Sequence, residues 1–225
     1  MISSKQSKPR ISRMANMFLA GFLLIVGMPL LEARPVSYAG GWTVMQKNNW
    51  ERNRLHVHYS PTVRNSLGAT AEIYRHSDRE DYGLQWNRLL YRRNTRFSQA
   101  NLYLKLNGGL ARLDPFDEPF LKAEVAGDWE TRRWFVAYSA MGKYADALDD
   151  GSFHQTARLG VAPYVAGFGS LHTWFMLQAG HHPEETHSED QLILTPLVRF
   201  FKGPYLLELG WSSNDEVLLN WIVRF

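Results

Sequence analysis

Hydrophobic and polar side chains alternate with a period of two along most of the chain after Gly40. Successive side chains of a β-strand point to opposite faces, so this alternation predicts strands with one apolar and one polar face. The clearest apolar face is that of the C-terminal run, which is formed by Val217, Leu219, Trp221, Val223 and Phe225. After Gly40, no stretch of ten or more residues shows a convincing helical stripe with capping residues. The pattern therefore predicts an all-β protein.

Turn-rich breaks divide the region after Gly40 into twelve predicted strands. They span approximately residues 41–47, 52–60, 66–75, 81–91, 100–110, 119–128, 132–142, 153–163, 170–180, 189–200, 205–212 and 216–225. A length of about ten residues is what a tilted strand needs to cross a bilayer. We therefore expect a closed antiparallel transmembrane β-barrel of about twelve strands, or of ten if 41–47 is only an N-terminal extension.

The first 39 residues have a different character. A basic stretch from Lys5 to Arg13 precedes the apolar run 17–31, and this run of about 15 residues is shorter than a membrane-spanning helix. Ser37-Tyr38-Ala39 places small residues where an export peptidase cuts, and Leu31-Glu32-Ala33 is a less favourable alternative. We expect residues 1–39 to be a cleavable secretory signal peptide, with an uncleaved anchor helix as the alternative, and residues 40–225 to form one barrel domain.

Charge and cysteine content narrow the function classes. The chain carries a formal net charge of +3, but five basic residues and one acid fall within residues 1–39, which leaves 20 basic and 21 acidic residues in the rest. Nucleic-acid binding therefore loses its main support. The chain has no cysteine, which excludes disulfides, thiolate metal sites and thiol nucleophiles.

A soluble barrel would show the same alternation with its apolar face turned inward, but three features favour a membrane barrel. Charged residues occur on the polar face of many strands, aromatic residues gather near strand ends, and the chain ends on Phe225. The terminal run resembles the C-terminal strand by which bacterial outer-membrane β-barrel proteins are recognised for assembly. The resemblance implies a Gram-negative outer membrane with both mature termini in the periplasm, outer-membrane lipid and the barrel assembly machinery as partners, and Trp221, Val223 and Phe225 as the assembly signal.

The polar faces of the predicted strands carry charges that would line the lumen. The basic residues are Arg54, Lys105, Lys122, Arg133, Arg158, Arg199 and Arg224, and the acidic residues are Glu72, Glu124 and Glu208. A lumen with more basic than acidic side chains attracts anions, because its low-dielectric walls focus the field. We expect a narrow channel or passive membrane component that favours small anionic solutes. The alternative is a salt-bridged interior that plugs the barrel.

Histidines offer a candidate metal site. His56 and His58 lie two residues apart on one strand face, a spacing that lets both imidazoles reach one ion. Residues 181–190 add His181, His182 and His187 among four acids, and a solvated outer loop is the alternative interpretation of this run. A surface interaction or metal-binding role of loops 143–152 and 181–190 is therefore one alternative function. No cofactor is expected.

A lipid-modifying hydrolase is a second alternative function. His58-Tyr59-Ser60 places a histidine and a serine on one strand face, and it resembles the histidine-x-serine pair of the lipid A deacylase family. The chain departs from that family in its strand count and in having no identifiable acidic third partner. Because a nucleophile needs both a base and an orienting group, no catalytic residue is assigned.

Deleting Phe225, or replacing both Trp221 and Val223 with Asp, should prevent membrane insertion. These changes remove the terminal aromatic residue or place carboxylates on the lipid face, where each costs up to about 2 kcal/mol. Heat-modifiable mobility in outer-membrane fractions measures insertion. Normal amounts of folded barrel for both variants would contradict the assignment of the assembly signal.

Overall fold

The regular structure of the chain consists of twelve β-strands. The computed structural model describes residues 35–49, 51–113, 116–145, 152–167, 169–181 and 192–225. The strands are β1 (Trp42–Asn48), β2 (Arg52–Thr62), β3 (Asn65–Tyr74), β4 (Glu80–Asn94), β5 (Ser98–Leu113), β6 (Phe116–Thr131), β7 (Trp134–Ala145), β8 (Ser152–Val161), β9 (His172–His181), β10 (Leu192–Lys202), β11 (Tyr205–Trp211) and β12 (Val217–Arg224). Each predicted strand is present, and the predicted all-β class is confirmed. Among the described residues, no helix is long and apolar enough to cross a bilayer.

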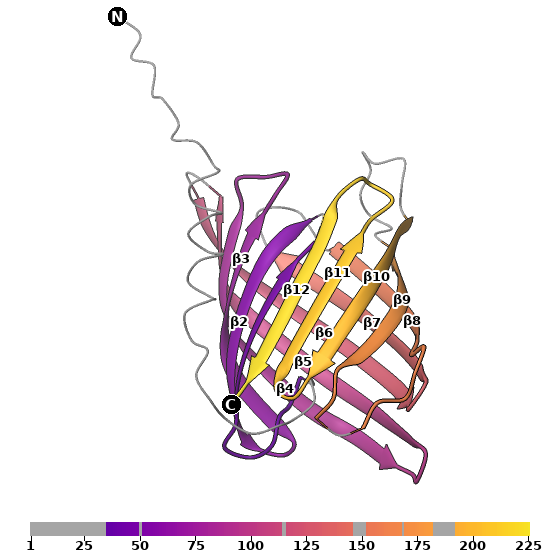
Figure 1. Ribbon diagram of the computed structural model, residues 1–225. Coiled ribbons are helices and arrows are strands. Elements are labelled where there is room, and N and C mark those ends of the chain that lie inside the picture. Colours follow the sequence, from indigo (N-terminus) through magenta and orange to yellow (C-terminus); the bar gives the residue numbers. More distant parts are fainter. Residues whose placement is uncertain (1–34, 50, 114–115, 146–151, 168, 182–191) are drawn as a thin grey trace, which may run out of the picture.

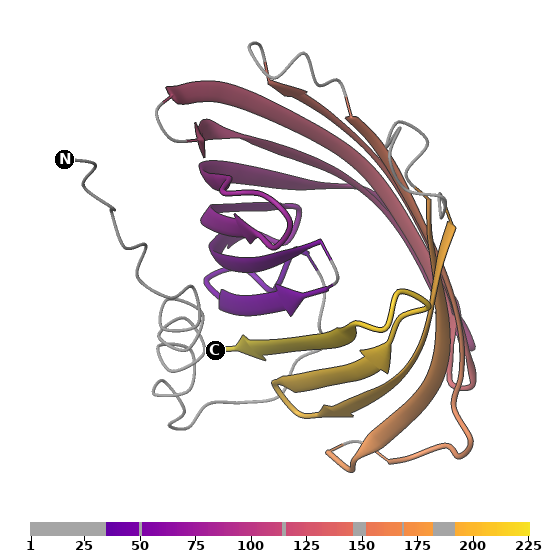
Figure 2. The same cartoon turned by 90° about the horizontal axis from the view of Figure 1, so that it is seen from above.

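The strands form one closed antiparallel barrel in which each pairs with its neighbours in sequence, and β1 pairs with β12. The registers place Thr43 of β1 opposite His58 of β2 on one side and opposite Arg224 of β12 on the other. Strand β1 is thus an integral part of the wall, so twelve strands are confirmed and the ten-strand alternative is wrong. Figure 1 shows the strands tilted side by side, and Figure 2 shows the wall from above.

The two ends of the barrel differ in their connections. The lower end in Figure 1 holds the C-terminus, together with the turns at 63–64, 95–97, 132–133 and 203–204 and the connection 162–171.

Strands β4 to β6 have 15 or 16 residues, which is longer than the sequence pattern predicted. Between β4 and β5, the register shifts between Leu89 and Tyr91. This bulge keeps Leu89 and Arg92 on the same inward face while β4 extends toward the lower end.

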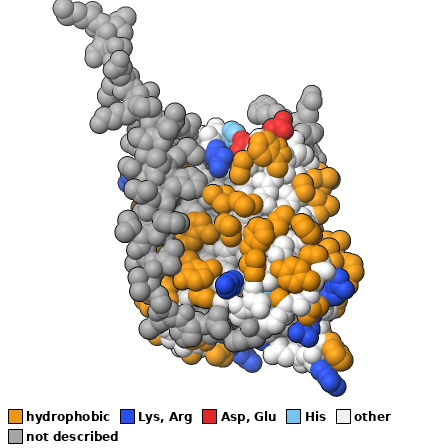
Figure 3. Space-filling view, in the orientation of Figure 1, with side chains coloured by type: hydrophobic (Ala, Val, Ile, Leu, Met, Phe, Trp, Pro, Cys, Tyr) orange, Lys and Arg blue, Asp and Glu red, His pale blue; other side chains and the backbone are white. Residues whose placement is uncertain are grey.

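The outer face of the barrel is apolar. Leucines at outward positions are strongly exposed, among them Leu84 (75%), Leu121 (56%) and Leu159 (54%). Hydrophobic side chains cover much of the outer surface in Figure 3, and the lysines and arginines visible there lie mostly toward the two ends. Inward positions of the same strands are polar and buried, such as Gln85 (5%) beside Leu84. A closed barrel with an apolar exterior and a polar interior is the arrangement that a bilayer requires.

Paired glycines let one side of the interior fill with side chains. Gly83 of β4 lies opposite Gly109 of β5, and a Cβ atom at Gly83 would lie 2.9 Å from the Phe120 ring. The missing side chain of Gly83 therefore leaves room for Phe120, which is 4% exposed and packs with Ala111 and Ala145. Its ring supports the Lys122 ammonium group, which lies 4.7 Å from the ring centroid.

Adjacent residues of β6 test which face meets lipid. Val125 points outward and is 48% exposed, whereas Ala126 lines the central cavity. Val125→Asp should lower the yield of folded barrel, since a carboxylate on the lipid face near the midplane costs up to about 2 kcal/mol. Ala126→Asp should fold normally because water reaches that position. Heat-modifiable electrophoretic mobility measures the yield of folded barrel for both variants. Equal yields would contradict the assigned faces.

Candidate functional site: the charged lumen

Nine of the ten charged residues that the sequence places in the lumen occupy inward-facing register positions. They are Arg54, Glu72, Lys105, Lys122, Glu124, Arg158, Arg199, Glu208 and Arg224. The register adds inward charges that the sequence pattern did not reveal, namely Lys47, Arg52, Asp81, Arg92, Glu118, Asp128, Glu130 and Lys143. Most of the missed residues lie near strand ends, where the alternation is short and the face of a side chain is hard to assign.

Arg133 lies in a different place from the one predicted, because β7 begins at Trp134. The Thr131 hydroxyl accepts hydrogen bonds from the amides of Arg133 and Trp134 and so fixes a tight turn between β6 and β7. From this turn, the exposed Arg133 side chain donates to the carbonyl oxygens of Ala162 and Pro163. Arg133 therefore links two connections at the lower end and does not stand on a strand of the lumen wall.

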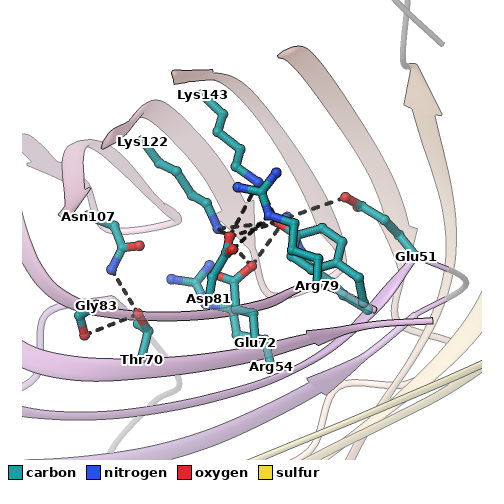
Figure 4. Close-up of polar contacts among 12 residues, drawn as sticks. Glu51, Arg54, Thr70, Glu72, Arg79, Asp81, Gly83, Asn107, Lys122 and Lys143 are labelled. Atoms are coloured by element: carbon teal, nitrogen blue, oxygen red, sulfur yellow. Dashed lines mark hydrogen bonds and ion pairs between the residues drawn. The ribbon is translucent and has the colours of Figure 1, made fainter. Parts of the chain in front are cut away.

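Two buried carboxylates organise an ionic network on one side of the interior (Figure 4). Glu72 of β3 is 1% exposed. It accepts Lys122 Nζ at 2.9 Å and lies 3.2 Å from Arg52 Nη1. Its second oxygen lies 3.3 Å from Arg54 Nε, and Arg54 also donates to the side-chain oxygen of Gln85. Glu72 thus holds three cations from two other strands against the wall.

Asp81 of β4 is the second centre of this network and is also 1% exposed. Arg79 Nε donates to it at 2.8 Å, and Lys122 Nζ donates at 2.9 Å. Lys143 Nζ lies 3.3 Å away, and the Tyr74 hydroxyl donates at 3.1 Å. Five cations therefore surround two carboxylates, and the network retains positive charge while it fills this side of the lumen.

A smaller cluster lies on β8, β10, β11 and β12. Glu208 Oε1 accepts Arg158 Nη1 at 2.9 Å and Arg199 Nη2 at 2.7 Å, and Glu208 Oε2 accepts Asn220 Nδ2 at 2.8 Å. Arg158 Nε also donates to Gln178 Oε1 at 2.7 Å, which fixes its guanidinium group. Two arginines share one carboxylate, so this side of the lumen also carries excess positive charge.

A cavity of about 1120 Å³ occupies the rest of the interior. Its lining includes Asn49 and Glu51 near the upper end, and Thr95 and Gly203 at the lower end, so it runs the length of the barrel. Eight basic and five acidic side chains line it. The basic ones are Lys47, Arg52, Arg54, Arg96, Lys105, Arg132, Arg158 and Arg199. The open part of the lumen therefore has the same sign of charge as its packed side.

Lys47 differs from Lys105, which lies in the same cavity lining. Lys105 Nζ donates to Glu124 Oε1 at 2.8 Å, which neutralises that pair. Lys47 of β1 makes no ion pair or side-chain hydrogen bond with any residue that the structure describes. Its side chain is exposed to the cavity. Its charge is thus available to a solute in the lumen.

The candidate histidines are dispersed. His56 and His58 face inward on β2, with ring centroids 4.6 Å apart, whereas His181 lies at an outward position opposite Gln155. His182 and His187 lie outside the described residues. In the described part of the chain, no group of three or more His, Asp or Glu residues is arranged to hold a metal ion. Metal binding by these histidines stays a prediction.

The histidine–serine pair of β2 also faces inward. Both ring nitrogens of His58 are buried and have no hydrogen-bond partner within the described chain. The Ser60 hydroxyl oxygen accepts the Ser37 amide at 3.1 Å. Both side chains are 0% exposed, so neither is open to a lipid substrate in this arrangement.

Comparisons with known proteins give structural likenesses only. No protein-family model and no curated protein matches the chain. A structure described as a KdgM porin in complex with disordered oligogalacturonate has a TM-score of 0.47 and 10% identity, over 82% of this chain and 96% of the other. A second KdgM porin structure has a TM-score of 0.42 and 8% identity, with the same coverage. A structure from work on in-meso crystallization of membrane proteins has a TM-score of 0.42 and 11% identity, over 84% and 83% of the two chains.

The barrel itself defines the class of protein. A closed ring of twelve antiparallel strands with an apolar exterior and a charged interior that encloses a cavity is a bacterial outer-membrane β-barrel of the porin-like type. The predicted fold and the predicted location in the outer membrane are therefore confirmed.

Replacing the centre of the ionic network should destabilise the barrel. Glu72→Gln keeps the side-chain shape but takes this carboxylate from the buried Lys122 and from the partly exposed Arg52 and Arg54. Breaking a buried ion pair in this way costs about 3–5 kcal/mol. The control is Asp117→Asn, which breaks the exposed Arg112–Asp117 pair at a cost below about 1 kcal/mol. The temperature at which the folded band disappears in gel electrophoresis measures the stability of both variants. Equal temperatures would show that the network does not stabilise the wall.

Proposed function

We propose that the barrel is a narrow outer-membrane channel that favours small anionic solutes. The observation that carries this proposal is the end-to-end cavity with an excess of basic side chains. The most important of these is the exposed Lys47, which has no ion pair among the described residues. Low-dielectric walls focus the field of these charges along the cavity and raise the local concentration of anions. Conduction also requires that a solute bind weakly enough to leave.

The ion-paired network and the open cavity occupy different parts of the lumen, which supports a channel for solutes rather than a plugged barrel. The network around Glu72 and Asp81 concentrates its ion pairs against β2, β3, β4, β6 and β7, and most of its members do not line the cavity. Lys47, Lys105, Arg158 and Arg199 stand around the open part. A solute that carries a carboxylate or phosphate group therefore meets cations from several strands in succession.

The orientation of the barrel in the membrane follows from its class. In an outer-membrane barrel of even strand number, both termini lie on the periplasmic side. The lower end of Figure 1 would then face the periplasm, and the connections at the upper end would face the exterior. The loops 143–152 and 181–190 would belong to that outer side, although residues 146–151 and 182–191 lie outside the described chain.

Reversing the charge at Lys47 tests the proposal. Lys47→Glu should shift the reversal potential of the channel in a salt gradient away from anion preference. A change of two unit charges that acts over about 8 Å of water is worth about 1 kcal/mol, or about fivefold in local anion concentration. Lys47→Gln should produce about half of that free-energy change. The measurement is planar-bilayer recording of the purified barrel.

Lys202→Glu is the matched control, because Lys202 points outward at the lower end and is absent from the cavity lining. Lys202→Glu should leave the anion selectivity of the channel unchanged. Oligogalacturonate is a suitable anionic probe, and its competition with chloride can be measured in the same recordings. Equal selectivity of the Lys47 variants and the wild type would contradict the proposal. Bilayers without discrete steps would favour a surface interaction through the outer loops. Altered lipid that disappears in Ser60→Ala would favour the hydrolase.

A further inference from the structure

The residues that precede β1 lie inside the barrel at its lower end. Ser66 Oγ of β3 donates to the Pro35 carbonyl oxygen at 3.0 Å, and Asn87 Nδ2 of β4 donates to Ser66 Oγ at 2.8 Å and to the same carbonyl at 3.5 Å. On β2, Ser60 Oγ accepts the Ser37 amide at 3.1 Å. These three wall residues face inward and are 0% exposed. Three neighbouring strands thus hold the backbone of this segment.

An apolar contact fixes the same segment. Val36 is 3% exposed and forms a buried cluster with Leu89 (5%) of β4 and Tyr103 (1%) of β5. Leu89 and Tyr103 occupy opposed inward positions on neighbouring strands. Burial of apolar surface away from water stabilises such a contact. Pro35 itself lines the cavity, so the segment forms part of the surface that a solute passes.

The position of the signal-peptide cut decides whether the exported protein keeps this segment. A cut after Ala39 would remove Pro35–Ala39, leave the Ser60 and Ser66 hydroxyls without these partners, and open the Leu89–Tyr103 contact to water. A cut ahead of Pro35 preserves each of these contacts. The sequence contains a site of this second kind at Leu31-Glu32-Ala33.

We propose that the leader is cut ahead of Pro35 and that Pro35–Ala39 remains in the mature barrel as a fixed constriction of the lumen at its lower end. The processing site and the packing of the segment stand independently of the channel function. Only the effect of the segment on conductance rests on that proposed function.

Intact-mass measurement and N-terminal sequencing of protein purified from outer membranes test the cut. The expected mature chain begins ahead of Pro35, at Arg34 if the peptidase cuts after Ala33. A chain that begins at Gly40 overturns the proposal, and so does one that still carries Met1. Neither result depends on whether the barrel conducts.

Thiol labelling tests the constriction, because the natural chain has no cysteine and an introduced one is the only thiol. Leu89→Cys should resist a water-soluble maleimide in the barrel that retains Pro35–Ala39. The same variant should react at least tenfold faster when an export leader is fused directly to Gly40, which deletes the segment. Val63→Cys, at a turn position that is 58% exposed, should react quickly in both barrels and is the control.

Heat-modifiable mobility shows that the shortened barrel has assembled, and conductance is then compared between the two forms. Equal labelling rates of Leu89→Cys in the assembled barrels with and without Pro35–Ala39 overturn the proposed constriction. If labelling differs while neither form conducts, the constriction stands and the channel function fails. Larger conductance steps from the shortened barrel support both.

Discussion

Closure of the sheet between β1 and β12 is the constraint on which the rest of the structure depends. A bilayer offers no water to hydrogen-bond a free strand edge, so each backbone donor and acceptor in the wall needs a neighbouring strand. The ring closes through the register from Thr43 and Arg224 to Asn48 and Leu219, and through two hydrogen bonds between the backbones of Trp42 and Phe225. Once the ring is closed, the strand period of two sends alternate side chains to lipid and to the lumen. The separation of apolar and charged residues then follows.

The alternation was sufficient to predict the fold because a membrane barrel expresses its topology in local sequence. Val217 to Phe225 and Leu102 to Leu106 alternate clearly enough to fix both the strand and its faces. Lys47 escaped prediction as a lumen residue because Gln46, Lys47 and Asn48 are all polar and give no local sign of which side faces in. Arg133 was misplaced because the strand start is set by the Thr131 side chain, which a period-two pattern does not reveal.

The ionic network shows what local sequence cannot supply. Glu72 and Lys122 are 50 residues apart in the chain, yet their charged atoms lie 2.9 Å from one another. Their meeting depends on the strand order, the register of several ladders and the space left by Gly83 for Phe120. A list of charged residues predicts a basic interior. Only the assembled barrel separates the cations that share carboxylates against the wall from those, such as Lys47, that remain available to a solute.

The proposed channel function requires a lumen that is open to water and electropositive. The most direct test of this requirement is the rate at which a single cysteine, placed at the cavity-lining Ala126 or Thr156, reacts with an anionic and with a cationic methanethiosulfonate of similar size. Each rate is divided by the rate of that reagent with a small free thiol. We expect that both reagents react, that the normalised rate of the anionic reagent is the larger, and that the difference shrinks as salt is added. Failure of both reagents to react, or a faster normalised reaction of the cationic reagent, would contradict the proposed function.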